Sequence, residues 1–226
     1  MRMRKTCTPG KRVPRLPCMQ LQKHGFWYHL LDVVFNIVVI VAIVAGIRTF
    51  LVSPFQVEGS SMIDTLTDKE YIIINKFAFL VGDPQRGDVV VFRPPNEPKK
   101  YYVKRIIGLP GDTVTIKDGY VYVQTAGEGE AQKLDEAGYL NPRNLAHTFR
   151  HPPSSGDQKP VTYHVPSGEY FLLGDNRQGS LDSRSFMGDD GKPMPFVQED
   201  SIKGRVWFIA LPITKIHALE APEYGL

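Results

Sequence analysis

The sequence predicts a mainly β domain over residues 53–226, preceded by one transmembrane helix over residues 30–52 and a basic leader over residues 1–29. Three observations lead to this prediction. Eighteen prolines and twenty glycines in 226 residues favour a turn-rich β fold over a helical bundle. Short apolar runs bounded by turn residues recur after residue 70, and the long uncharged apolar run lies near the N-terminus. A hydrophobic content of 42% is enough for a folded core.

The leader concentrates the positive charge of the chain. Residues 1–26 carry seven Lys and Arg and no Asp or Glu, while the whole chain has a net charge of +3, so residues 27–226 are mildly acidic. An acidic body disfavours a nucleic-acid partner, because binding phosphates needs a basic surface. The two cysteines, Cys7 and Cys18, both lie in the leader, which excludes a disulfide framework or a cysteine zinc site in the body. We interpret them as reduced cytosolic thiols, with palmitoylation or a disulfide as alternatives.

The apolar segment has the length of a membrane span. Residues 33–47 contain no charge, and residues 30–52 supply the roughly twenty residues that a span needs, with Asp32 and Arg48 near the ends. The basic leader should remain in the cytoplasm, which places residues 53–226 outside. A cleaved signal peptide and a buried core helix are the alternatives. No small-x-small site follows the run, Ser53-Pro54 is a poor cleavage point, and the flanking charges disfavour a core helix.

Short apolar segments after the helix predict strands. Short connections favour antiparallel pairing, and Asp118-Gly119 predicts a hairpin turn. The predicted strands are 71–75, 88–93, 101–108, 113–116, 120–123, 169–173 and 203–211. Residues 125–160 interrupt this pattern and predict a polar insertion or small subdomain at the edge, partly mobile. The six histidines, His24, His29, His147, His151, His164 and His217, show no HExxH-type spacing, so no metal site is predicted. No cofactor is expected.

Three segments carry the residues with chemical potential. Ser61 lies in the small-residue turn Gly59-Ser60-Ser61-Met62, where the backbone can approach a substrate and an amide can face a developing oxyanion. Lys104 lies in an otherwise apolar strand, either snorkelling at an edge or desolvated and able to act as a base. The third segment, residues 174–186, holds charged residues that could pair and fix a loop: Asp175, Arg177, Asp182 and Arg184. Taken singly, each segment also fits an ordinary loop, strand or charged turn.

The three segments, in this order after an apolar helix, resemble those of bacterial type I signal peptidases, the membrane-bound Ser-Lys proteases. The nucleophile box corresponds to residues 59–66, the lysine box to residues 102–105 with 108–112, and the third box to residues 174–177 with Ser180, Asp182, Ser183 and Arg184. The similarity covers roughly residues 30–125 and 165–212. It implies a β-rich Ser-Lys signal-peptidase-type catalytic core with one N-terminal transmembrane helix and an apolar surface facing the bilayer.

The resemblance also implies a role for each matching residue. Ser61 would be the nucleophile, Lys104 the general base, and Ser180 the residue that hydrogen-bonds and orients the lysine amine. Arg105 with Asp175, and Asp182 with Arg184, would be structural ion pairs. Met62 would shape the wall of the substrate site. Gly59 stands where some members carry an oxyanion-stabilising serine, so the Ser61 amide is the donor to name, and Asp64 replaces a proline that is usual in the nucleophile box.

The implied function is a serine endopeptidase of the plasma membrane that removes N-terminal signal peptides from exported preproteins through an acyl-enzyme. Its partners would be signal peptides and the lipid bilayer, with no nucleic acid and no metal. Two alternatives remain. A self-cleaving Ser-Lys regulator, like the repressors of the SOS response, is disfavoured by the anchor and by the absence of a DNA-binding module. An anchored β domain could instead bind exported proteins without cutting them, with Asp64 having disabled the site.

Overall fold

The computed structural model describes residues 25–95, 97–126, 129–150 and 159–224. The basic leader up to residue 24, with Cys7, Cys18 and His24, lies outside the described residues, as does His151. The chain divides into two compact units between Ile43 and Val44.

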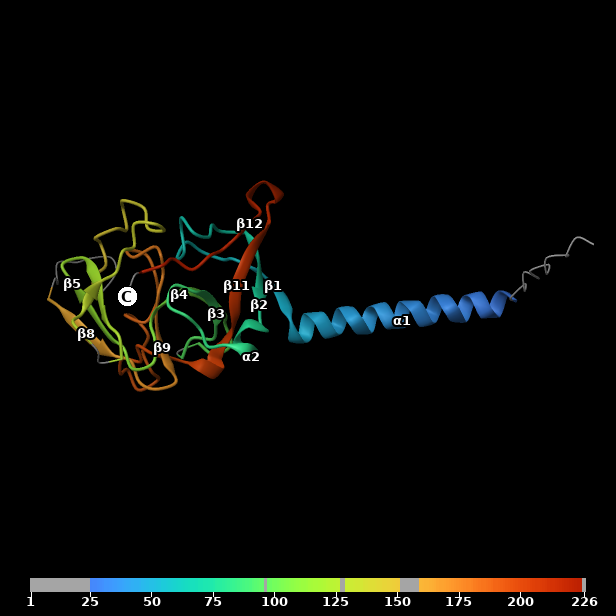
Figure 1. The fold of residues 1–226 in the computed structure, drawn as a ribbon, viewed down its shortest axis with the longest axis horizontal. Helices are drawn as coiled ribbons and strands as arrows, with labels where there is room; N and C mark the ends of the chain where they lie inside the picture. The colour runs from blue at the N-terminus through green and yellow to red at the C-terminus, as the bar shows by residue number, and fades with distance from the viewer. Residues whose placement is uncertain (1–24, 96, 127–128, 151–158, 225–226) are drawn as a thin grey trace, which may run out of the picture. The chain divides into compact units, whose positions relative to one another are not determined.

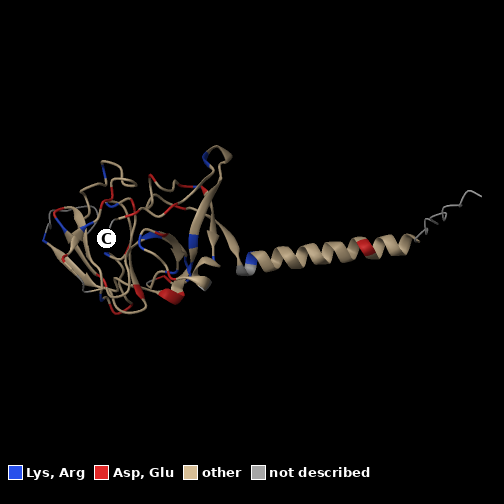
Figure 2. Ribbon diagram, viewed as in Figure 1, with Lys and Arg blue, Asp and Glu red and all other residues tan. Residues whose placement is uncertain are grey.

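Helix α1 (Phe26–Phe50) contains the apolar segment. Within the described ranges it is the one helix long and apolar enough to cross a membrane, and its two charged residues, Asp32 and Arg48, leave an uncharged stretch between them (Figure 2). The helix begins four residues before the predicted start and ends two residues before the predicted end. It ends earlier because the chain pairs as a strand from Val52, and because Pro54 disfavours helical backbone at the residue before it.

A large antiparallel sheet forms the centre of the second unit, which begins at Val44 (Figure 1). Its order is β1 (Val52–Gln56), β2 (Tyr71–Asn75), β11 (Ile202–Leu211), β3 (Val89–Phe92), β4 (Tyr102–Gly108), β9 (Glu169–Leu173) and β10 (Val197–Gln198), with β12 (His217–Ala218) paired to β11. A second antiparallel sheet runs β7 (Gln132–Lys133), β6 (Tyr120–Gln124), β5 (Thr113–Lys117) and β8 (Val161–His164). Short helical turns complete the unit: α2 (Ala78–Val81), η1 (Glu199–Ser201) and η2 (Ile213–Lys215).

The mainly β fold, the antiparallel pairing and all seven predicted strands are confirmed, with ends that differ by at most one residue. Strands β1 and β8 and the two-residue strands were not predicted. Strand β1 contains Pro54, which the sheet tolerates because β1 is an edge strand paired only with β2.

The middle of the large sheet, around β3, is buried on both faces, which is what positions the site. Along β3, Val89 and Val91 pack in one apolar cluster with Met62 and Leu66, while Val90 and Phe92 pack in another. Strand β4 lies between β3 and β9, so its second half crosses the middle of the sheet. A polar side chain on β4 is therefore held away from water.

Residues 129–150, the described part of the predicted insertion, pack onto the domain where a solvated, partly mobile edge was expected. Leu134 and Leu140 are buried, and so are the polar residues Glu136, Asn144 and Thr148. Thr148 N–H donates to the carbonyl of Gly119, which joins the segment to the β5–β6 hairpin. Gly119 is needed there, since a Cβ at this position would lie 2.0 Å from the carbonyl oxygen of Ala146.

Candidate active site

Residues 59–66, which we call the nucleophile turn after the role that the resemblance implies, follow β1 and are anchored in the core. Met62 and Leu66 are almost fully buried, and the carbonyl of Met62 accepts the N–H groups of Thr65 and Leu66, which makes one helical turn. Gly59 has φ +89°, a conformation that favours glycine, and its amide donates to Asp68 Oδ1 at 2.8 Å. These contacts place the half-buried Ser61 between the buried Met62 and the exposed residues Gly59 and Ser60.

Lys104 lies against Ser61. Its Nζ is in hydrogen-bond contact with Ser61 Oγ at 2.7 Å and donates to the carbonyl of Val103 at 2.8 Å. The lysine is only 3% exposed, and the ring of Tyr102 lies 5.4 Å from Nζ. The sheet therefore brings together two residues that are 43 positions apart in the sequence.

Burial makes the amine of Lys104 less basic than that of a solvent-exposed lysine. Desolvation disfavours the ammonium and lowers the pKa of Lys104 from 10.5 to about 8; the charges of Asp182 and Asp175 act in the opposite direction, and Arg184 adds to the lowering. A lysine with this pKa is partly neutral near pH 7, so its lone pair can accept the proton of a serine hydroxyl.

The third segment holds the nucleophile turn from behind. Asn176 N–H donates to the carbonyl of Ser61, and its Nδ2 donates to the carbonyl of Ser60, each at 3.0 Å. Gly174 allows this approach, because a Cβ there would lie 2.5 Å from the Ser61 carbonyl oxygen and 2.1 Å from Ser180 Oγ. The two hydrogen bonds from Asn176 fix the position of the nucleophile turn relative to the third segment.

Two buried ion pairs support the same segment. Arg105 donates through Nε and Nη2 to the two carboxylate oxygens of Asp175 at 3.0 and 2.7 Å. Arg184 donates to both oxygens of Asp182 at 2.8 and 2.7 Å. Thr65 joins the first pair to the nucleophile turn, because its hydroxyl donates to Asp175 Oδ2 at 2.5 Å.

Ser180 does not make the expected hydrogen bond to the lysine amine. Its hydroxyl is buried beside the Asp182 carboxylate, at a geometry short of a full hydrogen bond. The amine instead contacts Ser61 Oγ and donates to the Val103 carbonyl. The Ser180 hydroxyl lies close to the Cα of Gly174, since a Cβ on Gly174 would be 2.1 Å from it.

A groove of about 490 Å³ runs past Ser61 and Lys104. One side is the outer edge of β1, which pairs only with β2, and the other is the first half of β4, which pairs only with β3 until β9 joins at Arg105. Met62 and Leu181 contribute apolar lining, and the rings of Phe55 and Tyr101 meet edge to face with centroids 5.2 Å apart. Two open strand edges suit an extended peptide.

Comparison with known proteins identifies the family. The sequence model of the family described as signal peptidase, peptidase S26, matches residues 30–211. The chain belongs to this family. Signal peptidase I of Pseudomonas aeruginosa is 42% identical over 166 residues, covering 63% of this chain and 58% of its own length. Signal peptidase I of Bacillus licheniformis is 37% identical over 180 residues, covering 80% of this chain and 88% of its own length.

Two further matches carry the same name. Signal peptidase I T of Bacillus subtilis is 37% identical over 180 residues, which is 80% of this chain and 84% of the relative. The solved structure of a signal peptidase I from Enterococcus faecalis V583 is 31% identical, covers 55% of this chain and 97% of its own, and has a TM-score of 0.38. Family membership assigns the chain to the serine peptidases that remove signal peptides.

The structure adds detail at three residues of the site. The Ser61 amide has no acceptor among the described residues, whereas the Gly59 amide is engaged by Asp68, so Ser61 offers the free donor. Asn176, which the sequence placed in the third box without a role of its own, donates through its side chain to the Ser60 carbonyl. Asp64 has φ +85°, a backbone conformation that proline cannot adopt, so the turn differs in shape from one built on the usual proline.

Proposed function

We propose that this peptidase cleaves signal peptides with Ser61 as nucleophile and Lys104 as general base. The observation that carries the proposal is the 2.7 Å contact between Lys104 Nζ and Ser61 Oγ, made by a lysine that is buried in the sheet. A base within hydrogen-bond reach of a hydroxyl, with a pKa lowered toward neutrality, is the arrangement that activates a serine.

The reaction proceeds through an acyl-enzyme. Neutral Lys104 accepts the Ser61 proton while Oγ attacks the scissile carbonyl carbon, and the Ser61 amide donates to the resulting oxyanion. The peptide C–N bond then breaks, and the ammonium of Lys104 gives its proton to the leaving amine, which is the N-terminus of the mature protein. Lys104 next takes a proton from water, the hydroxide attacks the ester, and the signal peptide leaves with a new carboxyl group as Ser61 regains its proton.

The substrate binds as an extended strand in the groove. Its main chain would lie between the outer edge of β1 and residues 102–104, and its small side chains at the first and third positions before the cut would point at the groove wall near Met62. Gly59 faces open space at the turn, which leaves room for the peptide backbone.

Helix α1 anchors the enzyme in the plasma membrane as a single span. The leader, with its excess of Lys and Arg, would stay in the cytoplasm, and residues 53–226 would lie on the outer side. Signal peptides remain in the membrane after translocation begins, so anchoring raises the effective concentration of the substrate at the groove.

The test is cleavage of a secretory preprotein by the full-length chain in detergent, with the new N-terminus of the product read by mass spectrometry. Ser61→Ala is compared with Ser167→Ala, which changes an exposed serine in the β8–β9 turn. A cut after a small-x-small sequence, made by the wild type and Ser167→Ala but not by Ser61→Ala, is expected. Equal cleavage by Ser61→Ala would remove the nucleophile from the proposal, and no cleavage by a folded wild type would favour a non-catalytic binder.

A further inference from the structure

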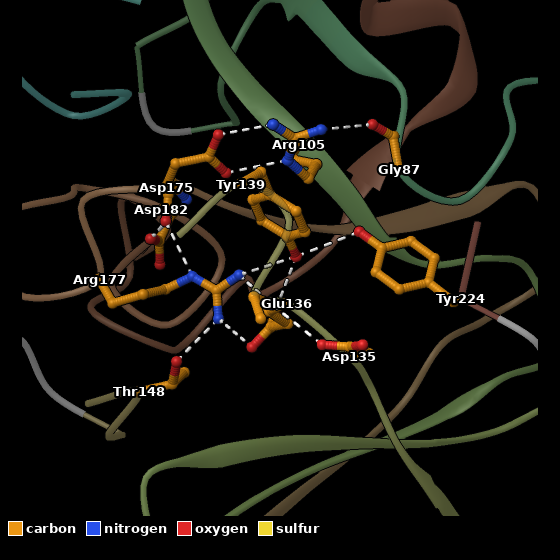
Figure 3. Close-up of polar contacts among 12 residues, drawn as sticks. Gly87, Arg105, Asp135, Glu136, Tyr139, Thr148, Asp175, Arg177, Asp182 and Tyr224 are labelled. Carbon is orange, nitrogen blue, oxygen red and sulfur yellow. Dashed lines mark hydrogen bonds and ion pairs between the residues drawn. The ribbon is translucent and has the colours of Figure 1, made fainter. Parts of the chain in front are cut away.

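Residues 134–149, which we call the brace, place charged and aromatic side chains beneath the third segment of the site. The brace belongs to the polar insertion, for which the sequence indicated no role. Glu136 is 3% exposed and Thr148 is fully buried. Figure 3 shows both side chains pointing at the guanidinium of Arg177.

Arg177 is fully buried, and the brace supplies most of its partners. Its Nη1 donates to Glu136 Oε2 at 3.0 Å and to Thr148 Oγ1 at 2.7 Å, and its Nη2 donates to Glu136 Oε1 at 2.5 Å. The remaining donor, Nε, bonds the carbonyl of Gly174 at 3.1 Å. Glu136 is thus the carboxylate that balances a buried cation whose other end holds the main chain of the active site.

Tyr139 connects this pair with the ion pair nearer the nucleophile. Its ring faces Arg105, whose guanidinium carbon lies 4.0 Å from the ring centroid. Its hydroxyl donates to Glu136 Oε1 at 2.7 Å and accepts from Arg177 Nη2 at 3.4 Å and from the hydroxyl of Tyr224 at 3.1 Å. Tyr139 therefore lies between the two arginines, as Figure 3 shows.

These contacts converge on the three residues that hold the dyad. Gly174 is bonded through its carbonyl by Arg177 and through its amide by Asp182. Asp175 is bonded by Arg105, which Tyr139 covers. Asn176, next in the chain, bonds the carbonyls of Ser60 and Ser61. A shift of Arg177 or Arg105 would therefore move the nucleophile turn relative to Lys104.

We propose that Glu136 and Tyr139 of the brace are positioning residues for the Ser61–Lys104 dyad, acting through Arg177 and Arg105. The inference deepens the proposed function and rests on it. Neither residue has a hydrogen bond to Ser61 or Lys104, and neither lines the groove. The insertion is then part of the catalytic machinery by geometry and charge, although it contributes no group to the chemistry.

Charge makes the proposal testable by pH. The charged groups that act on Lys104 are Asp175, Asp182 and Arg184 of the third segment, and Tyr102 of its own strand supplies only a ring face. Arg177 interacts with Asp175 as well as with Glu136. Removing the charge of Glu136 leaves Arg177 to draw on Asp175, so the field at Lys104 becomes more positive and disfavours the ammonium further.

The experiment compares Glu136→Gln with Glu130→Gln in the full-length chain in detergent. Glu130 loses the same charge in the same insertion but is exposed. For Glu136→Gln we expect kcat to fall roughly 10- to 100-fold through misplacement of the dyad. KM should change little, because Glu136 does not line the substrate groove. The acid limb of its pH profile should move to lower pH. Glu136→Asp should restore the wild-type limb, and Glu130→Gln should match the wild type throughout.

The results separate positioning from simple stability. The folded fraction of each variant is measured by circular dichroism and thermal unfolding. If the activity of Glu136→Gln falls only in proportion to its folded fraction, and the acid limb of its pH profile does not move, the role of Glu136 is structural alone and the proposal is overturned. Wild-type kcat in folded Glu136→Gln would also overturn it. If Glu136→Gln does not fold, Tyr139→Phe and Thr148→Val decide, since each removes one hydroxyl and little volume; wild-type kcat in both overturns the proposal. Wild-type and Ser61→Ala activities in the same assay show separately whether the proposed function itself holds.

Discussion

Cleavage is expected to depend steeply on pH between pH 6 and 9, because Lys104 must be neutral to accept the Ser61 proton. With the pKa of Lys104 at about 8, the neutral fraction is about 1% at pH 6, about 9% at pH 7 and about 91% at pH 9. The value of kcat/KM should therefore rise roughly 90-fold over this range and level off above it. A solvated lysine with a pKa of 10.5 would be only about 0.03% neutral at pH 7, so burial increases the active fraction there roughly 300-fold.

The assay is initial-rate cleavage of a peptide substrate that has no titrating group in this range, with the folded fraction measured at each pH. Since kcat/KM reports the free enzyme, its inflection gives the pKa of the essential base before substrate binds. A flat profile from pH 5 to 10 would contradict a lysine base. An inflection near 10.5 would show that Lys104 is solvated, and one near 6.5 would indicate a histidine.

Three further predictions concern stability and geometry. Lys104→Met should abolish cleavage yet raise the free energy of unfolding at pH 7 by about 3 kcal/mol. The pKa of Lys104 is lower in the folded state than in the unfolded chain, so the destabilisation caused by burying this amine is present below pH 8 and disappears as pH rises through 10.5. Denaturant unfolding at pH 7 and pH 10 checks this difference. Asp64→Gly should stabilise the chain by about 1 kcal/mol because φ is +85° there, whereas Asp64→Pro should lower both Tm and activity; a more stable Asp64→Pro would refute the turn geometry. Gly174→Ala should lower Tm and reduce the activity of the folded fraction at least 100-fold, because its Cβ would displace Ser180 and the Ser61 carbonyl; near-wild-type kcat would contradict the close approach.

Local pattern was enough to predict the strands, because their apolar residues are consecutive in sequence and bounded by Gly, Pro and Asp. Strand β4 could be predicted in this way, but the state of Lys104 could not, because a lysine between apolar neighbours also fits an exposed edge. Its burial results from β3 and β9 on either side of β4, and from clusters that cover both faces of the sheet. The resemblance to a known family supplied what the pattern left open at this position.

The brace could not be predicted, because buried charges look like surface charges in a sequence. Glu136 and Arg177 are 41 positions apart, and each lies in a segment rich in polar residues. Only the folded chain shows that both are removed from water and paired. The same limit applies to Ser180, whose neighbours depend on how the third segment folds back over Gly174.

The choice of cations around the site explains why a single group can titrate there. Three buried arginines, Arg105, Arg177 and Arg184, are paired with three buried carboxylates, and arginine keeps its proton at any pH that the enzyme would meet. Each carboxylate is therefore already balanced, and among the described groups none is left to form an ion pair with Lys104. Desolvation then outweighs the attraction of Asp175 and Asp182, and the lysine becomes the one buried cation of the site that can lose its proton. A lysine in place of any of the three arginines would introduce a second titrating amine and blur the distinction on which the dyad depends.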